Sequence, residues 1–486
     1  MHLIRGIGSK SGAMVSRGLL RRGVLPRSNR CGTASSGART PPEDWAACLL
    51  HTGPPWELGV ARSSSLPTQR TPFDREEPEV EGPSLATGFA ARCGDARSSE
   101  RTQATSQVGV TRMSLSDALA LGPAVWDAVL ARAELPSPFM SWAWHRAWAD
   151  SAPAADVAAS DVLVLRGAGG AVQALLPVLL RRIPFHRVPV RALTWAIGDL
   201  GCPDHLDVLA DPAADVGALA PVLEDLPWHL LNLSNLAPNA ATARRLCESI
   251  AGHGYALRRQ ALFACPYLEL CDDWERYLAT LTRTRRQTLR RKERNLQRHH
   301  SMAIVDYEGH RLSEGWSRLV RLHERRWEGG GGGAFQDLSL RRLHRRFATE
   351  LAARQQLWLT TLDLDGETAA AWYGFTLRDT VYFYQSGRDP RWDRESVGLV
   401  LMAAMIRRAI ERGYRRLDFL RGEDGYKRLW TDARRCTEEI TVFRPGWRGR
   451  SLRALDAAAL LRAWLRGRGG GCGSERDVPA GESNDE

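Results

Sequence analysis

The alternation of apolar and polar residues between positions 357 and 420 predicts a strand-rich unit interrupted by one helix. The expected strands are residues 357–363, 368–377, 381–385 and 415–420. Two-residue turns at Asp365 and Arg378 separate the first three strands, which is typical of an antiparallel meander. Apolar residues from Leu399 to Ile410 then recur at helical spacing, and Gly413 is the expected helix cap. Because this helix connects the last two strands, we expect them to pair in parallel.

Similar patterns divide the rest of the chain. We predict a first α/β domain in residues 113–254, a second domain in residues 255–445, and a short helix followed by a low-complexity tail in residues 446–486. The elements expected in the first domain are helices at 118–132, 141–150 and 240–251 and strands at 162–165, 172–180, 205–209 and 229–233. The helices expected before the meander are residues 274–298 and 338–354. Trp142, Trp144 and Trp148 are expected in a core or domain seam, with a ring-stacking ligand site as the alternative.

Residues 1–112 lack a sustained hydrophobic pattern and are rich in Arg, Ser, Gly and Pro, so we expect them to be disordered. Two explanations account for this extension. Residues 1–42 contain no Asp or Glu, which is typical of an organellar transit peptide. Alternatively, the extension is spurious and the protein starts at Met113, where a helical pattern begins with Ser116 as its cap. We favour the second explanation.

Charge and composition narrow the class of ligand. The formal net charge is +11, and arginine far outnumbers lysine. Since arginine suits bidentate binding of phosphate or carboxylate, we expect an anionic ligand, although a solvated basic surface explains the same composition. No run of about 18 apolar residues occurs, so no transmembrane helix is expected. The scattered cysteines form no C-x-x-C pair, so we expect no metal and a cytoplasmic location.

The phosphate loop, the dinucleotide-binding glycine pattern, the serine-esterase elbow and the H-E-x-x-H zinc pattern are all missing from the sequence. One other candidate phosphate-binding segment lies at the start of the helix after the meander. It comprises Arg394, Ser396, Gly398 and Leu399. A helix N-terminus offers unpaired N–H groups, glycine permits close approach of the backbone, and a neighbouring arginine adds charge. These residues therefore predict a pyrophosphate site, with an ordinary helix cap as the alternative.

Three segments in this order resemble a known family. They are residues 384–392 (Tyr-Gln-Ser-Gly-Arg-Asp-Pro-Arg-Trp), 398–401 (Gly-Leu-Val-Leu) and 418–430, which begins Asp-Phe-Leu-Arg-Gly-Glu. Together they resemble the GNAT acetyltransferases of the cellulose-biosynthesis (CelD) type, which are similar to the Fem-type aminoacyl transferases. The resemblance implies an α/β (α+β) fold of tandem GNAT-like domains, each a mixed, mostly antiparallel sheet flanked by helices. It also implies that acyl-CoA binds along the third strand, with its pyrophosphate at the helix start.

One departure from the family concerns this helix start. Where the family often has Ser-Pro-Gly, the chain has Ser396, Val397 and Gly398. The change loosens the turn but keeps the glycine.

Acyl transfer from a thioester needs donors for the carbonyl oxygen, a base for the attacking amine and a donor for the departing thiolate. The polar residues that we expect around the ends of the strands are Tyr384, Asp418, Glu423 and Tyr426. Each has a structural alternative; Asp418 would cap a turn, and Tyr384 would lie in the core with its hydroxyl bonded. Lys427 is expected to bind substrate, with a surface ion pair as its alternative.

The basic segment 283–298 places arginines, including Arg286 and Arg290, near one helix face. A solvated face needs no ligand, and this is the default interpretation. The second interpretation is binding of an anionic substrate, such as the 3′-phosphate of CoA or a diphosphate-bearing polysaccharide precursor. Nucleic-acid binding is the third, and the lack of interleaved aromatic residues speaks against it.

The sequence and the resemblance together predict an acyltransferase that uses acetyl-CoA or another acyl-CoA. It transfers the acyl group to an amine, with a hydroxyl as the alternative, on a small molecule or a glycan precursor. The site lies in the second domain, and the first domain has no evident site. A Fem-like transferase that uses aminoacyl-tRNA is the rival enzyme, and an inactive binding module of a polysaccharide biosynthesis complex is the alternative outside enzymes. The sequence leaves the acceptor, the acyl chain length and the oligomeric state open.

Overall fold

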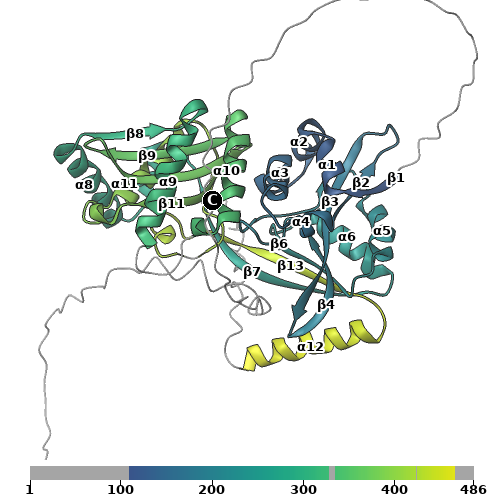
Figure 1. Ribbon diagram of the computed structural model, residues 1–486. Coiled ribbons are helices and arrows are strands. Elements are labelled where there is room, and N and C mark those ends of the chain that lie inside the picture. Colours follow the sequence, from purple (N-terminus) through teal and green to yellow (C-terminus); the bar gives the residue numbers. More distant parts are fainter. Residues whose placement is uncertain (1–108, 328–333, 423, 466–486) are drawn as a thin grey trace, which may run out of the picture. The chain divides into compact units, whose positions relative to one another are not determined.

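The computed structural model describes residues 109–327, 334–422 and 424–465 (Figure 1). The predicted extension therefore lies outside the described residues up to position 108, as do the tail from residue 466 and the predicted site residue Glu423. Residues 109–112 belong to the first strand. Within the described ranges, none of the helices is both long and apolar enough to cross a membrane.

Strands and helices follow one another in two similar series. The strands are β1 (Gly109–Ser114), β2 (Ser160–Arg166), β3 (Val172–Phe185), β4 (Val188–Trp195), β5 (Leu209–Ala210), β6 (Leu230–Leu236), β7 (Ala256–Glu269), β8 (Met302–Asp306), β9 (Leu357–Leu364), β10 (Glu367–Leu377), β11 (Thr380–Arg388), β12 (Arg416–Asp418) and β13 (Arg434–Phe443). The helices are α1 (Leu115–Ala120), α2 (Pro123–Arg132), α3 (Trp142–Ala149), α4 (Ala154–Ala158), α5 (Ala220–Asp225), α6 (Ala241–Gly252), α7 (Trp274–Thr280), α8 (Arg283–His299), α9 (Leu312–Trp327), α10 (Leu338–Ala353), α11 (Val397–Glu411) and α12 (Trp447–Leu465).

The strand order of the sheet is symmetric about its middle. It runs β1-β2-β3-β4-β6-β13-β7-β12-β11-β10-β9-β8. An antiparallel meander β1–β4 is followed by the parallel pair β4–β6, and likewise the meander β8–β11 is followed by the parallel pair β11–β12. We call β1–β7 the first repeat and β8–β13 the second repeat. The predicted fold class, a tandem arrangement of mixed, mostly antiparallel sheets flanked by helices, is confirmed.

The two repeats exchange their last strands. β7, which ends the first repeat, pairs with β12 of the second, and β13, which ends the second repeat, pairs with β6 of the first. β7 and β13 also pair with each other along most of their length. The repeats are therefore joined by backbone hydrogen bonds as well as by side chains.

Alternating residues of β11 enter two different cores. Tyr382 packs with side chains of α9 and α10, whereas Phe383 packs with α11 and α8 on the other face of the sheet. Trp144 of α3 contacts Phe347 of α10 edge to face, with ring centroids 4.9 Å apart. The predicted role of this tryptophan in the core is confirmed, and it packs the first repeat against α10.

Two predicted elements differ from the structure. The predicted helix 274–298 is broken at Leu281, because Thr282 accepts a hydrogen bond from the Arg285 N–H and starts α8 as a new helix. Within the predicted strand 205–209, His205 has a φ of 56° and only Leu209 enters a strand. Asp207 instead accepts hydrogen bonds from the first N–H groups of α6, so this segment is a loop that caps a helix.

Candidate functional site

The whole of the short strand β12 pairs with the beginning of β11. The last pair is Tyr382 with Asp418, where β12 ends, while β11 continues to Arg388. The Phe419 N–H turns away and donates to the Pro266 carbonyl of the neighbouring β7. The edge of β11 beyond Tyr382 is therefore not covered by β12.

A β-bulge lies directly beyond the point where the strands part. In the pairing of β11 with β10, Gly374 is opposite Phe383 and Tyr373 is opposite Gln385, so Tyr384 is the extra residue. A bulge leaves the extra residue unpaired and redirects its backbone groups, and bulges are common beside active sites. The bulge and the parted strands together place backbone donors at an edge where a ligand can bind.

The N-terminus of α11 follows β11 by a short connection. Its cap residue Ser396 is in the left-handed region with a φ of 61°, and its side chain makes no capping hydrogen bond. A methyl group added to Gly398 would meet only Cδ of Arg388, at 4.0 Å. The Leu399 and Val400 N–H groups donate to the Ser396 carbonyl oxygen, at 3.0 and 3.2 Å. The N–H groups of Val397 and Gly398 come before this first pair of bonds and lie beside open space, which is the arrangement that binds anions. Leu399 lies in the same turn and packs at the edge of the core beneath α11.

Basic residues surround this helix start. Arg394 is exposed, and its carbonyl oxygen accepts a hydrogen bond of 2.6 Å from Nζ of Lys292 on α8. Arg388, at the end of β11, forms an ion pair with Asp393. The predicted pyrophosphate residues are therefore brought together at one helix end, and α8 lies beside them.

The two predicted arginines of α8 are already engaged. Nη1 of Arg286 donates to the carbonyl oxygens at the end of α7, those of Leu278 (3.1 Å) and Leu281 (3.1 Å) among them. Arg290 forms an ion pair with Glu275. Both residues fasten α7 to α8, and their predicted contact with substrate stays a prediction.

Asp418 is fully buried where β12 ends. One carboxylate oxygen accepts a hydrogen bond of 2.7 Å from the Leu420 N–H, and the other pairs with Arg435 of β13 and lies 3.2 Å from Nε2 of His205. Burial alone would raise the pKa of Asp418, but the charges of His205 and Arg435 outweigh it and hold the pKa well below its ordinary value. Asp418 is therefore an ionised group that orients its two partners.

The loop of the first repeat that supplies His205 also supplies Asp204. Its buried carboxylate accepts hydrogen bonds from Nε (2.7 Å) and the backbone N–H (2.9 Å) of Arg421, three residues after Asp418. His205 is itself buried, and its Nδ1 has no hydrogen-bond partner among the described residues. Sequence patterns indicated no role for Asp204, Arg421 or Arg435, because their partners lie in distant segments.

Lys427 is buried and not at the surface. Its Nζ donates to the Arg421 carbonyl oxygen at 2.8 Å and lies 3.6 Å from a carboxylate oxygen of Asp424. Burial lowers the pKa of Lys427. Tyr426 is half-buried and contacts the ring of Phe383 edge to face. Both residues therefore lie against the end of β12, in the connection to β13.

Tyr384 directs its hydroxyl into the junction between the repeats. The hydroxyl donates to the Gly201 carbonyl oxygen at 2.8 Å and lies 2.7 Å from Nε2 of His344 on α10. Burial raises the pKa of Tyr384 well above its ordinary value, and burial lowers the pKa of His344 to about 3. Both groups are neutral at pH 7, and they link α10, β11 and the first repeat.

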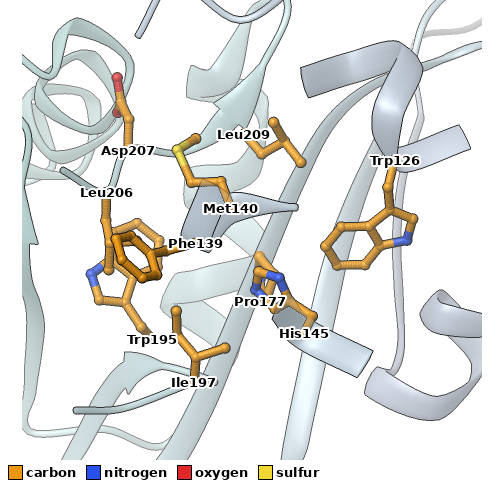
Figure 2. Close-up of a pocket in the computed structure, with 10 residues that line it drawn as sticks. All are labelled: Trp126, Phe139, Met140, His145, Pro177, Trp195, Ile197, Leu206, Asp207 and Leu209. Atoms are coloured by element: carbon orange, nitrogen blue, oxygen red, sulfur yellow. The ribbon is translucent and has the colours of Figure 1, made fainter. Parts of the chain in front are cut away.

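The first repeat lacks the corresponding features. The pairing of β4 with β3 continues without a register shift. The connection from β4 to β6 contains the short strand β5, a 3-10 helix at Val216–Leu219 and the six-residue α5, where the second repeat has the 15-residue α11. A cavity of about 10 Å³ lies in its apolar core and has room for no more than one water molecule (Figure 2). Its polar members are His145, which contacts the Ser141 carbonyl oxygen, and Asp207, which caps α6. These side chains hold the fold together.

Within the described residues, no cluster of His, Cys, Asp and Glu has the composition of a metal site.

A comparison with protein-family models finds a match that includes most of the second repeat. Residues 283–428 match the family model of the acetyltransferase (GNAT) domain. This segment includes β11, α11, β12 and the predicted site residues from Arg286 to Lys427. No curated protein matches the chain.

Several solved structures are similar in fold. A structure of FemX is 10% identical, with a TM-score of 0.48, over 71% of this chain and 99% of that chain. L-PGS from Bacillus licheniformis is 10% identical, with a TM-score of 0.43, over 69% and 96% of the two chains. A tandem GNAT protein from the clavulanic acid biosynthesis pathway is 13% identical, with a TM-score of 0.39, over 70% and 100%. The family match, and not these distant likenesses, identifies a GNAT-type acetyltransferase domain in the second repeat.

Proposed function

We propose that the second repeat catalyses direct transfer of an acyl group from acyl-CoA to an amine. The observation that carries the proposal is the coincidence, at one end of β11, of three features: the parting from β12, the bulge at Tyr384 and the open N-terminus of α11 at Gly398. GNAT domains generally use acyl-CoA, and these features offer one donor site for a thioester carbonyl and another for a pyrophosphate.

In this proposal the pyrophosphate binds the first turn of α11 at the Gly398 N–H, with Leu399 in the same turn and Arg394 adding a charge-assisted contact. The pantetheine lies along the uncovered edge of β11, so the thioester carbonyl reaches the bulge at Tyr384. The acceptor nitrogen attacks that carbonyl, a C–N bond forms and the C–S bond breaks. The amine gives up a proton to a base, and the departing thiolate takes one up.

The acceptor is proposed to bind where β12 ends. Asp418 would act by orienting His205 and Arg435, because both of its oxygens already accept contacts. The predicted residues Glu423 and Tyr426 are the groups proposed to take the proton of the amine. Lys427 fixes the loop after β12 through the Arg421 carbonyl.

The proposed acceptor is an amine on a polysaccharide or cell-envelope precursor. The resemblance of residues 384–392 and 418–430 to CelD-type enzymes supports an amine on a polysaccharide or cell-envelope precursor. Exposed arginines of α8, such as Arg291, Arg294 and Arg298, would suit an anionic precursor next to the CoA site.

The test is release of free CoA from acetyl-CoA in the presence of amino sugars and other amines, together with calorimetric binding of acetyl-CoA. We expect acetyl-CoA to bind whether or not an acceptor is present, and free CoA to be released only when an acceptor is present. Release that requires aminoacyl-tRNA and is destroyed by ribonuclease would establish the Fem-like alternative. A protein that binds no acyl-CoA and transfers nothing would be the binding module.

A further inference from the structure

A second cavity, of about 370 Å³, lies between strands and loops of the first repeat and the start of α12. It is lined by residues of β4, of the segment before β6 and of the turn that leads from β13 into α12. Its volume is within the usual range for small-ligand sites. No residue of the proposed acyl-transfer site lines it.

The lining carries an excess of positive charge. Arg191, Arg444 and Arg448 contribute three guanidinium groups, and Asp225 contributes one carboxylate, which gives a formal charge of three minus one, or +2. Within the described ranges, no ion pair to a carboxylate is found for any of the three arginines. A dianion such as phosphate would balance this charge.

Arg444 is held rigidly in place by backbone carbonyl groups. Its Nη1 donates to the Leu226 carbonyl oxygen at 2.6 Å, and its Nη2 donates to that of Glu224 at 2.6 Å. The guanidinium carbon lies 5.3 Å from the ring centroid of Trp228. Neutral carbonyl groups and an aromatic ring position this cation without cancelling its charge, so its field persists in the cavity.

His229 adds a neutral hydrogen-bond donor. The Arg191 N–H donates to Nδ1 of His229 at 3.2 Å, so Nδ1 is the acceptor nitrogen and the ring carries its proton on Nε2. Nε2 has no hydrogen-bond partner among the described residues. Burial and the charges of Arg191 and Arg448 lower the pKa of His229, so the ring stays neutral at pH 7. The cavity thus offers an N–H donor and three cations for an anion.

We propose that this cavity binds a phosphate-bearing ligand, either a soluble phosphate compound or the headgroup of an anionic lipid. Three guanidinium groups and one imidazole N–H match the several acceptor oxygens of a phosphate better than the two of a carboxylate. The neighbourhood also fits a lipid source, because Trp447 beside Arg448 is 68% exposed. Later residues of the same helix, Leu461 and Trp464, are 56% and 70% exposed.

The first experiment measures binding of inorganic phosphate by calorimetry at low salt. Replacing Arg191→Gln or Arg448→Gln should weaken binding roughly tenfold or more, since each substitution removes a charge-assisted contact. Arg450→Gln is the matched control, because Arg450 is exposed on the same helix and does not line the cavity. The melting temperature of each variant shows that the fold persists.

The second experiment distinguishes the two sources. Co-sedimentation is compared for vesicles of phosphatidylcholine alone and for vesicles that also contain phosphatidylglycerol. Binding to the anionic vesicles that is lost in Arg448→Gln and kept in Arg450→Gln indicates a lipid headgroup. Phosphate binding in solution without vesicle binding indicates a soluble ligand. No binding in either experiment, or an equal loss in the Arg450→Gln control, would overturn the proposal.

The cavity must also be separated from the proposed CoA site, because CoA carries phosphates itself. Arg191→Gln should leave acetyl-CoA affinity and acyl transfer unchanged, and Gly398→Ala should leave binding of inorganic phosphate unchanged. If Arg191→Gln weakens acetyl-CoA as much as phosphate, the cavity is not a separate site.

Discussion

Gly398→Ala is the sharpest test of the proposed CoA site, because its effects on stability and on binding should have opposite signs. The added methyl group would meet only Cδ of Arg388, at 4.0 Å, so the fold accommodates it without movement. Alanine in a helix is more favourable than glycine by about 0.5–1 kcal/mol, and the variant should therefore melt at the same temperature or slightly higher. The same methyl group occupies the open space into which a pyrophosphate oxygen would have to move.

The expected loss of affinity follows from the contacts that the methyl group disturbs. A phosphate oxygen must lie about 2.9 Å from a backbone nitrogen to accept its hydrogen bond. Displacing one or two such charge-assisted bonds at the first turn of α11 costs about 1.5–3 kcal/mol, or roughly 10- to 150-fold in the Kd for acetyl-CoA.

The assay is calorimetric titration with acetyl-CoA, paired with thermal unfolding of the same samples. Gly252→Ala is the matched control, because Gly252 also belongs to a helix, α6, and an added methyl group there meets nothing within 4 Å. The control should keep its affinity. Unchanged acetyl-CoA affinity in Gly398→Ala, with its melting temperature preserved, would refute the placement of the pyrophosphate at α11.

Three further predictions concern buried polar groups. Asp418→Asn should lower the free energy of unfolding by about 3 kcal/mol at pH 7, because it leaves Arg435 without its ion pair. The difference from the wild type should be complete above pH 4 and should disappear as the pH falls through the lowered pKa of Asp418 in the folded state. Urea unfolding at several pH values measures it. Tyr384→Phe removes the hydrogen bond to the Gly201 carbonyl oxygen and should lower the free energy of unfolding by about 1 kcal/mol. The affinity for acetyl-CoA should change less than twofold. A larger loss of affinity would show that the hydroxyl contacts the ligand. Burial lowers the pKa of His145 to about 4 in the folded protein. As the pH falls, this histidine is therefore protonated in the unfolded chain before it is protonated in the folded one, and the free energy of unfolding should fall between pH 6.5 and pH 4. His145→Gln should flatten that part of the curve of stability against pH.

The parts of the fold that could be predicted are those with a local signal. The meander and α11 were predicted nearly to their ends, because their apolar positions repeat with the strand and helix periods over many residues. The start of α11 also has a local signal, since Ser396 and Gly398 are only two positions apart in the sequence. The predicted strand at 205–209 was wrong, because this segment is held by contacts with distant parts of the chain. His205 contacts Asp418, and Asp207 accepts a hydrogen bond from the Ala243 N–H.

The network around Asp418 had no local signal. Asp204 lies more than 200 residues before Arg421, and no periodicity connects the two segments. The exchange of β7 and β13 was equally hidden, because a strand pattern shows that a segment is extended and does not name its neighbours. In the proposed acyl-transfer site, the residues expected to bind CoA are therefore close together in the sequence and could be predicted from it. The residues around the proposed acceptor are brought together by tertiary contacts and could not.

The position of β13 in the chain has a consequence for synthesis. β6 is complete once residue 236 has left the ribosome, but its neighbour β13 is made only with residues 434–443. At about 5–20 residues per second, the edge of β6 stays open for roughly 10 to 40 seconds of translation. An uncovered edge strand of this kind pairs readily with other chains. The nascent protein should therefore depend on chaperones until its last strand is made, and chains truncated before residue 434 should aggregate.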